Sequence, residues 1–145
     1  MSSKYLWTRL EETVSSAVHA FPGVAGVCVT SFKSPHRLSI HGSEVFPTAS
    51  TIKIHILAQL FQRAERGEID LEDRICVSKK NYCPGSGVLT QLHHKVEMSL
   101  LDIATLMMIV SDNTATNICI DIAHMAQTNS MIQKLGLKST YLRRK

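Results

Sequence analysis

The sequence predicts a mixed α/β (α+β) fold on three observations. Residues 3–20 show the apolar spacing of an amphipathic helix, and residues 24–46 show the β-branched, turn-interrupted composition of a β-hairpin. Helical spacing returns near residue 50 and dominates the remainder of the chain. A helix followed by strands and then by further helices favours α/β or α+β over a helical bundle. We therefore expect an N-terminal helix, a hairpin and a mostly helical region, in that order.

Length and composition favour one soluble, packed domain over residues 1–145. Apolar residues make up 44% of the chain and charged residues 19%, which is ordinary for a globular protein. No apolar run approaches the roughly 18 residues of a membrane helix. The start, "MSSKYLWTRLEETV", also lacks the apolar region of a signal peptide. We therefore expect a cytoplasmic protein without a membrane partner.

The charged residues, histidines and cysteines argue against several classes of partner. The net charge is +4, but Lys and Arg are scattered, so no nucleic-acid partner is expected. His93 and His94 are adjacent without a second ligand pair at a zinc-like spacing, so we expect neither a metal nor another cofactor. The four cysteines form no CxxC pair and are predicted to be free, mostly buried thiols.

The first two elements follow directly from local pattern. The apolar face of the first helix recurs at threes and fours and comprises Leu6, Leu10, Val14, Ala17, Val18 and Phe21. Pro22 and Gly23 end this helix. The hairpin over residues 24–46 consists of "VAGVCVTSF", the turn "KSPHR" and "LSIHGSEVF".

A second helix is predicted from about Ser50 to the stop signal Gly67. Its buried face is expected to comprise Ile52, Ile56, Leu57, Leu60 and Phe61. Residues 68–96 show no sustained period and contain Pro84, Gly85 and Gly87. We therefore expect a long connection there, which packs through isolated residues: Leu71, Ile75 and Leu89.

Three further helices complete the prediction. A capping box of Ser99 and Asp102 precedes "LLDIATLMMIV", in which Met107 and Met108 are expected to fill space in the core. This helix runs into "SDN", and "TATNICIDIAHM" and "NSMIQKLG" follow as helices, the last with Gly136 as its stop.

Ser50 and Lys53 are the first candidate functional residues. At a spacing of three, their side chains can converge above the start of a helix, where unpaired N–H groups stabilise an alkoxide. Partial burial would push Lys53 toward the neutral form that a general base needs. The ordinary alternative is an N-cap serine followed by a solvated lysine, and Ser-x-x-Lys alone is weak evidence.

"SDN", Ser111 to Asn113, strengthens the functional interpretation. A short loop after a buried helix can present a hydroxyl and a carboxamide into a cleft. The structural alternative is capping where two helices meet. The two motifs in this order are harder to explain by capping alone.

With these motifs in place, the chain resembles the N-terminal half of a class A β-lactamase, within the penicillin-recognising serine hydrolases. The resemblance covers nearly the whole chain. It lies in "FPTASTIK", "ERGEIDLEDRI", "GSGVLTQL", "IVSDNTATNICID" and "LGLKSTYLRR". It implies a truncated β-lactamase/transpeptidase-like fold and a small-molecule substrate, either a β-lactam or a D-alanyl cell-wall peptide.

The resemblance also implies roles for individual residues. Ser50 would attack the carbonyl of the substrate and become acylated, while Lys53 helps to remove its proton. Ser111 would pass a proton to the departing nitrogen, and Asn113 would hold the substrate's side-chain amide and contact Lys53. The backbone N–H of Ser50 would form one arm of an oxyanion hole. Asp112 is expected to brace the loop.

Several family features do not occur within residues 1–145. "KST" at 138–140 lacks the glycine of K-[ST]-G, and the ω-loop glutamate and the final strands fall outside the chain. We therefore expect either a fragment of a longer protein or a shortened relative that survives by repacking or dimerising. In both cases acylation should stall before hydrolysis. The hairpin edge would lie open and could join two copies of the chain. "MAQTNS" replaces a glycine pair that is frequent in the family, and either lengthens a helix or reshapes a turn.

Two other functions stay open at this point. A penicillin-binding or D,D-peptidase-like acylase, or an esterase relative, would use the same nucleophile. A catalytically inert descendant would instead bind peptidoglycan fragments or a partner protein, with Ser50 and Lys53 kept for capping and packing.

Overall fold

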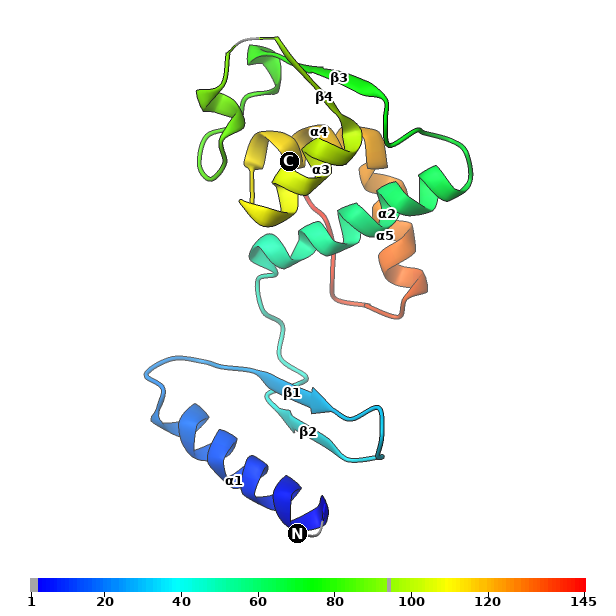
Figure 1. Ribbon diagram of the computed structural model, residues 1–145. Coiled ribbons are helices and arrows are strands. Elements are labelled where there is room, and N and C mark those ends of the chain that lie inside the picture. The colour runs from blue at the N-terminus through cyan, green and yellow to red at the C-terminus, as the bar shows by residue number, and fades with distance from the viewer. Residues whose placement is uncertain (1–2, 94) are drawn as a thin grey trace. The chain divides into compact units, whose positions relative to one another are not determined.

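The structure, a computed structural model, describes residues 3–93 and 95–145. The chain forms two compact units, Met1–Phe46 and Pro47–Lys145, which are described in turn (Figure 1). A single domain over residues 1–145 stays a prediction. His94 lies outside the described residues, so the prediction for the His93–His94 pair is not tested at that position.

The first unit contains the predicted helix and the predicted hairpin. Helix α1 spans Ser3–Ala20, and strands β1 (Val27–Thr30) and β2 (Arg37–Ile40) pair antiparallel. Val29 lies opposite Leu38 in the register, and Leu38 is buried. Side chains alternate between the two faces of a strand, so one face of the hairpin is sheltered while the other stays exposed.

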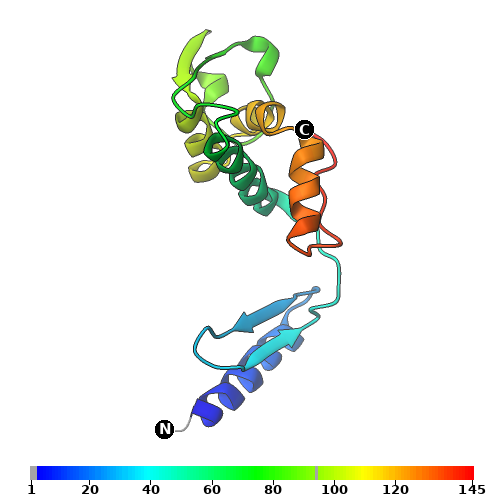
Figure 2. The ribbon, with the colours of Figure 1, turned by 90° about the vertical axis from the view of Figure 1, so that its right-hand side faces the viewer.

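Helix α1 runs beside the hairpin in both ribbon views (Figures 1 and 2). The Trp7 and His36 rings lie 5.6 Å apart between their centroids and connect the helix to the turn of the hairpin. The apolar face of α1 is less covered than its pattern predicts, because Leu6 is 53% exposed and Phe21 is 55% exposed. The helix itself is confirmed, but most of its apolar stripe is left at the surface.

The second unit holds four helices around one apolar core. They are α2 (Lys53–Glu65), α3 (Leu100–Ile109), α4 (Asn113–Ala123) and α5 (Met125–Lys134). Helix α2 packs against the other three (Figures 1 and 2). The largest fully buried apolar side chains are Ile56, Leu60, Leu89, Leu100, Ile103, Met107 and Ile132. Helix α4 adds the buried Ala115, Ile118 and Cys119. Burial of apolar side chains from all four helices is the main force that holds the unit together.

The helix boundaries differ from the predictions in instructive ways. Ser50 lies in a short 3₁₀ turn, Ala49–Ile52, that precedes α2. Helix α5 begins at Met125, so "MAQTNS" lengthens a helix, and the sharp break before it falls at His124, with φ of 60°. Two packing predictions were wrong: Phe61 is 46% exposed and Met108 is 38% exposed. Both predictions rested on helical spacing, which does not show how far a neighbouring element covers each side chain.

Residues 68–96 were predicted as a long connection, and this was wrong in part. Strands β3 (Arg74–Val77) and β4 (Val96–Ser99) pair antiparallel within and just beyond this stretch. Each strand has four residues, which is too short for an alternating pattern to stand out from the sequence. The predicted packing of the stretch is confirmed, because Leu89 is fully buried, and Leu71 and Ile75 pack against the core.

The cysteines are free, as predicted, but they are not mostly buried. Cys119 is buried in the core, whereas Cys28 and Cys76 are exposed and Cys83 is half-buried.

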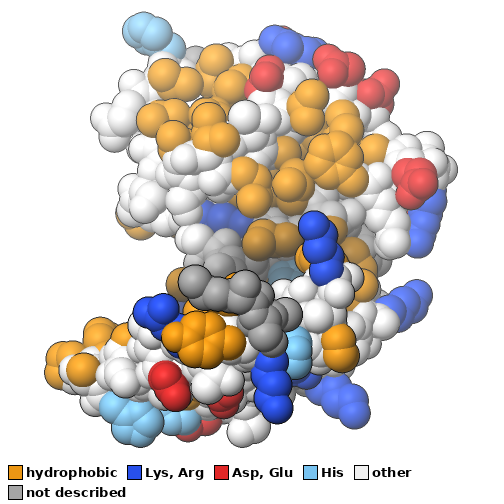
Figure 3. Space-filling model, turned by 60° about the horizontal axis from the view of Figure 1, so that its bottom comes forward, with side chains coloured by type: hydrophobic (Ala, Val, Ile, Leu, Met, Phe, Trp, Pro, Cys, Tyr) orange, Lys and Arg blue, Asp and Glu red, His pale blue; other side chains and the backbone are white. Residues whose placement is uncertain are grey.

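Hydrophobic side chains also gather at the surface, as Figure 3 shows for one face. Among the exposed apolar residues, Ile109 is 70% exposed and Leu135 is 63% exposed. Over the described ranges, no helix is both long enough and apolar enough to cross a membrane.

Candidate active site

Ser50 and Lys53 lie at the start of α2, as their spacing predicts. Ser50 sits in the 3₁₀ turn and is exposed to solvent, and Lys53 is the first residue of α2 and is only 5% exposed. The residue before the serine, Ala49, has a positive φ of 44°. Such a backbone conformation costs free energy for a non-glycine residue, so the surrounding structure must hold it in place.

Ser111 joins the two residues of the first motif. Its hydroxyl lies 2.9 Å from Ser50 Oγ and accepts a hydrogen bond of 2.7 Å from Lys53 Nζ. Lys53 Nζ also donates to the Ser111 carbonyl oxygen at 2.9 Å. In the described part of the chain no hydrogen bond joins Ser50 to Lys53 directly. The three side chains converge as the motifs predict, but the connection runs through Ser111.

The environment of Lys53 favours its neutral form. Burial is the larger effect and lowers the pKa of the ammonium, because the charged form loses water. The negative charge of Asp112 acts in the opposite direction and raises this pKa, but by less. The net result is a lysine that is more easily deprotonated than usual beside two hydroxyls. A neutral amine of this kind can accept a proton from a serine.

Asp112 holds the loop that carries Ser111. It is 1% exposed, and its carboxylate accepts backbone N–H groups from Val88 at 2.6 Å, Leu89 at 2.9 Å and Ala115 at 2.9 Å. A buried carboxylate is tolerated where several N–H groups bind it. It caps α4 and ties residues 88 and 89 to the α3–α4 turn. This is the bracing role that the sequence suggested for Asp112.

Gly87 allows the loop over residues 83–89 to lie against this turn. Its φ is 128°, and a Cβ atom built there would lie 2.3 Å from the Asp112 carboxylate and 2.7 Å from the Asp112 Cα. Only glycine permits both the conformation and the close approach. The sequence pattern predicts a loop at Gly87 but does not predict that Gly87 contacts Asp112. The nearby pair of glycines in "PGSG" was the available hint.

Asn113 lies beside the site, but its contact differs from the expected one. Its Nδ2 donates to the Pro84 carbonyl at 3.0 Å, and its backbone N–H donates to the Ser86 carbonyl at 2.9 Å. The expected contact with Lys53 is not among the hydrogen bonds of the described residues. The side-chain amide of Asn113 is bound instead by the loop over residues 83–89. This loop lies against the α3–α4 turn, where the Asp112 carboxylate accepts the Val88 N–H and Gly87 packs against Asp112.

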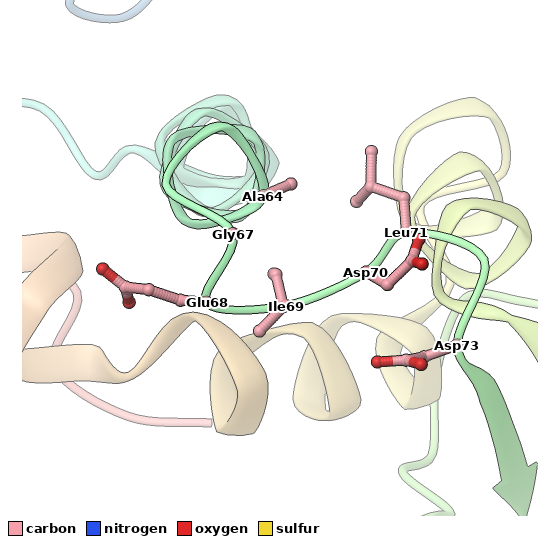
Figure 4. Close-up of a pocket in the computed structure, with 7 residues that line it drawn as sticks. All are labelled: Ala64, Gly67, Glu68, Ile69, Asp70, Leu71 and Asp73. Atoms are coloured by element: carbon pink, nitrogen blue, oxygen red, sulfur yellow. The ribbon is translucent and has the colours of Figure 1, made fainter.

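A hollow near the C-terminal end of α2 is separate from these residues. It is lined by Ala64, Gly67, Glu68, Ile69, Asp70, Leu71 and Asp73 (Figure 4). Its carboxylates do not form a metal centre: within residues 3–93 and 95–145, no group of three His, Cys, Asp or Glu side chains could hold a metal ion. The candidate active site is the hydroxyl–amine cluster of Ser50, Ser111 and Lys53.

Comparison with known proteins decides the family. Residues 9–145 match the sequence model of the beta-lactamase enzyme family. The chain belongs to this family. One curated relative is the beta-lactamase regulatory protein BlaB of Streptomyces cacaoi, which is 26% identical to this β-lactamase-family chain. The alignment covers 88% of this chain and 41% of BlaB. A beta-lactamase of Proteus vulgaris is 28% identical over 77% of this chain and 41% of its own length.

Solved structures show that this β-lactamase-family chain has the β-lactamase fold over the region it contains. A beta-lactamase from Sphaerobacter thermophilus is 33% identical, with a TM-score of 0.87 over 93% of this chain and 51% of that protein. The protein PBP-A is 32% identical, with a TM-score of 0.85 over 94% of this chain and 52% of its own. The chain thus spans about half the length of these solved relatives and 41% of the two curated relatives above.

Proposed function

We propose that the protein is a serine β-lactamase-like acylase in which Ser50 is the nucleophile. One observation carries this proposal: the Ser50 and Ser111 hydroxyls and the Lys53 amine form a continuous hydrogen-bonded chain. The nucleophile at one end is exposed, and the amine at the other end is buried with a lowered pKa. A substrate can reach the serine, while the group that takes its proton stays out of water.

The acylation step follows from this arrangement. Ser50 Oγ attacks the carbonyl carbon of a β-lactam amide and forms a C–O bond as its proton moves to the Ser111 oxygen. As the C–N bond breaks, the Ser111 proton moves to the departing ring nitrogen. If Lys53 takes that proton first, its ammonium returns it through Ser111 to the same nitrogen. The nitrogen leaves as an amine, and the acyl group stays on Ser50 as an ester. General base catalysis of this kind contributes about 10²–10⁴ in rate.

Asn113 is proposed to bind the side-chain amide of the substrate. Its Nδ2 is held by the Pro84 carbonyl, which fixes the orientation of the carboxamide. Its Oδ1 has no hydrogen-bond partner among the described residues and can therefore accept an N–H group. The half-buried position next to Ser111 suits a contact with the part of the substrate beyond the reacting ring.

Hydrolysis of the ester needs a base that activates water, and Asp112, which follows Ser111 in the chain, is poorly suited to this task. Asp112 is buried and already accepts three backbone N–H groups. We therefore expect the 145-residue chain to accumulate its acyl-enzyme. This behaviour is that of a penicillin-binding acylase, the second candidate function. A variant of the relative PBP-A was solved as an acyl-enzyme complex with penicillin G.

Intact-protein mass spectrometry after incubation with penicillin G tests the proposal. The chain is expected to gain the mass of one penicillin and keep it for many minutes. Ser50→Ala should show no adduct, because it lacks the nucleophile. Lys53→Ala and Ser111→Ala should slow adduct formation by about 10²–10⁴, the usual contribution of a general base. Ser139→Ala, which removes an exposed hydroxyl remote in sequence, serves as the matched control and should react like the unsubstituted chain.

Two results would contradict the proposal. Labelling that persists in Ser50→Ala would move the chemistry to another nucleophile, and the exposed Cys28 and Cys76 would be examined first. Rapid release of hydrolysed penicillin without an adduct would contradict the stalled ester.

A third candidate is a binding protein without catalysis, which the similarity to a β-lactamase regulatory protein favours. It predicts no adduct with any β-lactam. It also predicts that a cell-wall peptide binds with equal affinity to the unsubstituted chain and to Ser50→Ala.

A further inference from the structure

Helices α2 and α5 enclose a polar groove that the proposed chemistry does not use. Its volume is about 300 Å³, at the lower end of the range for small-molecule sites. Its lining comes from α2 and the turn after it, and from α5: Gln59, Gln62, Arg66, Glu68, Gln127, Ser130, Met131, Lys134 and Leu135. Positions 127, 130, 131 and 134 share one face of α5. Positions 59 and 62 share one face of α2, and Arg66 follows directly after that helix.

Gln59 is the unusual residue of this groove. It is 2% exposed, and its Oε1 is buried without a hydrogen-bond partner. Its Nε2 makes one long hydrogen bond of 3.4 Å to Gln127 Oε1. Buried amides nearly always satisfy both ends, since a lone buried acceptor is unfavourable. Gln59 lines the groove, so a rotation of its carboxamide would offer this unpaired acceptor to an N–H donor that enters there.

The charges at the groove favour an anion. Glu68 is held by Arg63, whose Nε lies 2.9 Å from Glu68 Oε2, and more loosely by Arg66 at 3.9 Å. Arg63 also donates to the Ile122 carbonyl, which fixes it beside Glu68. This leaves the exposed Lys134 without an ion-pair partner among the described residues, and Arg66 with only a weak one. Both can turn toward a carboxylate in the groove.

We propose that this groove binds a small carboxylate that also carries an N–H group, of the class of N-acylated amino acids. The N–H donates to Gln59 Oε1, and the carboxylate accepts from Lys134 and Arg66. The site is distinct from the proposed active site. Gln59 lies six residues beyond Lys53, or about 9 Å farther along the axis of α2, and Arg66 lies farther still.

Titration of the ¹⁵N-labelled chain with N-acetylglycine, followed by NMR, tests this proposal. Saturable shifts are expected at backbone amides of α2 and α5 and at the side-chain amide of Gln59. Acetate supplies only the carboxylate, and N-methylacetamide supplies only the N–H. Each should bind at least about tenfold more weakly, since each loses one of the two hydrogen-bonding groups.

Two exposed lysines provide a matched pair of variants. Lys134→Gln should weaken N-acetylglycine binding about tenfold, whereas Lys138→Gln, outside the groove, should leave it unchanged. Gln59→Met keeps the length of the side chain, removes the acceptor and should abolish the preference over acetate. If Gln59→Met does not fold, the lysine pair and the two half-ligands still decide. Shifts that fail to saturate, or equal binding of acetate and N-acetylglycine, would overturn the proposal.

Discussion

Lys53 places an amine in the interior of the unit formed by residues 47–145. Two oxygens of Ser111 accept from its amine, and the buried Asp112 carboxylate supplies a compensating charge. Burial nevertheless outweighs this compensation and lowers the pKa of Lys53. A buried residue that is costly in its charged form and hydrogen-bonded to a chain of hydroxyls is typical of a functional site.

The lowered pKa predicts how acylation depends on pH. Proton transfer from Ser50 requires neutral Lys53, so the acylation rate should rise with pH. It should level off below the ordinary lysine value of 10.5, because the folded-state pKa is depressed. Stopped-flow labelling with a fluorescent penicillin across neutral and alkaline pH would measure this profile. A rate that falls with rising pH, or that keeps rising through 10.5, would refute it.

The same pKa has a consequence for stability with a definite sign. Between the lowered folded-state pKa and the unfolded value near 10.5, the unfolded chain binds more protons at this residue. The contribution of Lys53 to the free energy of unfolding therefore rises with pH across that window. Comparing urea denaturation of the chain and of Lys53→Met over the same pH range isolates this contribution.

At the scale of elements, the α3–α4 turn and the loop over residues 83–89 form one locked assembly. Asp112 accepts the Val88 and Leu89 amides, Asn113 donates to Pro84, and Gly87 fits directly against Asp112. Ser111, in this turn, has a positive φ of 54°, which places its hydroxyl toward Ser50. The position of the Ser111 hydroxyl thus depends on the packing of a loop that is distant in sequence.

Two glycine substitutions test this dependence. Gly67 and Gly87 both have positive φ, but a Cβ at Gly67 meets nothing within 4 Å, whereas one at Gly87 strikes Asp112. Gly67→Ala should cost about 1–2 kcal/mol of stability through backbone strain alone and leave penicillin labelling unchanged. Gly87→Ala should cost more and also slow labelling, because Asp112 and Ser111 are displaced.

Urea denaturation and adduct formation would be measured for both variants. Equal losses of stability with unaltered labelling in both would show that the loop does not position Ser111.

At the scale of the whole chain, the hairpin leaves two open strand edges within its sheet. Among the residues that the structure describes, β1 and β2 form a two-stranded sheet, and such sheets are marginal without further cover. Exposed edges of this kind offer unpaired backbone groups to another chain. The relatives of known structure are about twice as long as this chain.

We propose that the isolated chain associates through this hairpin. Multi-angle light scattering in the presence of a reductant, which excludes disulfides between exposed cysteines, should show a dimer that grows with concentration. Cys28→Lys places a charge on the exposed face of β1 and should shift the chain toward monomer. Cys76→Lys, on β3 in the other unit, is the matched control and should not. A monomer at every concentration would contradict the proposal.

The sequence by itself determined the elements whose apolar spacing, turn residues or caps form a clear local pattern. The bounds of α1, the hairpin, the stop of α2 at Gly67 and the N-cap at Ser99 follow from neighbours in the chain. The residues of the candidate site were also recognisable, since Ser-x-x-Lys and Ser-Asp-Asn are local motifs. Their roles as nucleophile, base and proton donor stay predictions.

The tertiary structure alone decided what depends on residues far apart in sequence. Three such contacts are the pairing of β3 with β4, the hydrogen bond from Asn113 to Pro84 and the hydrogen bond from Lys53 to Ser111. Each joins residues at least 19 positions apart. Local periodicity carries no information about such contacts, because their geometry is set by how helices pack around a shared core. For the same reason the exposure of Phe61, Met108 and two of the cysteines could be seen only in the folded chain.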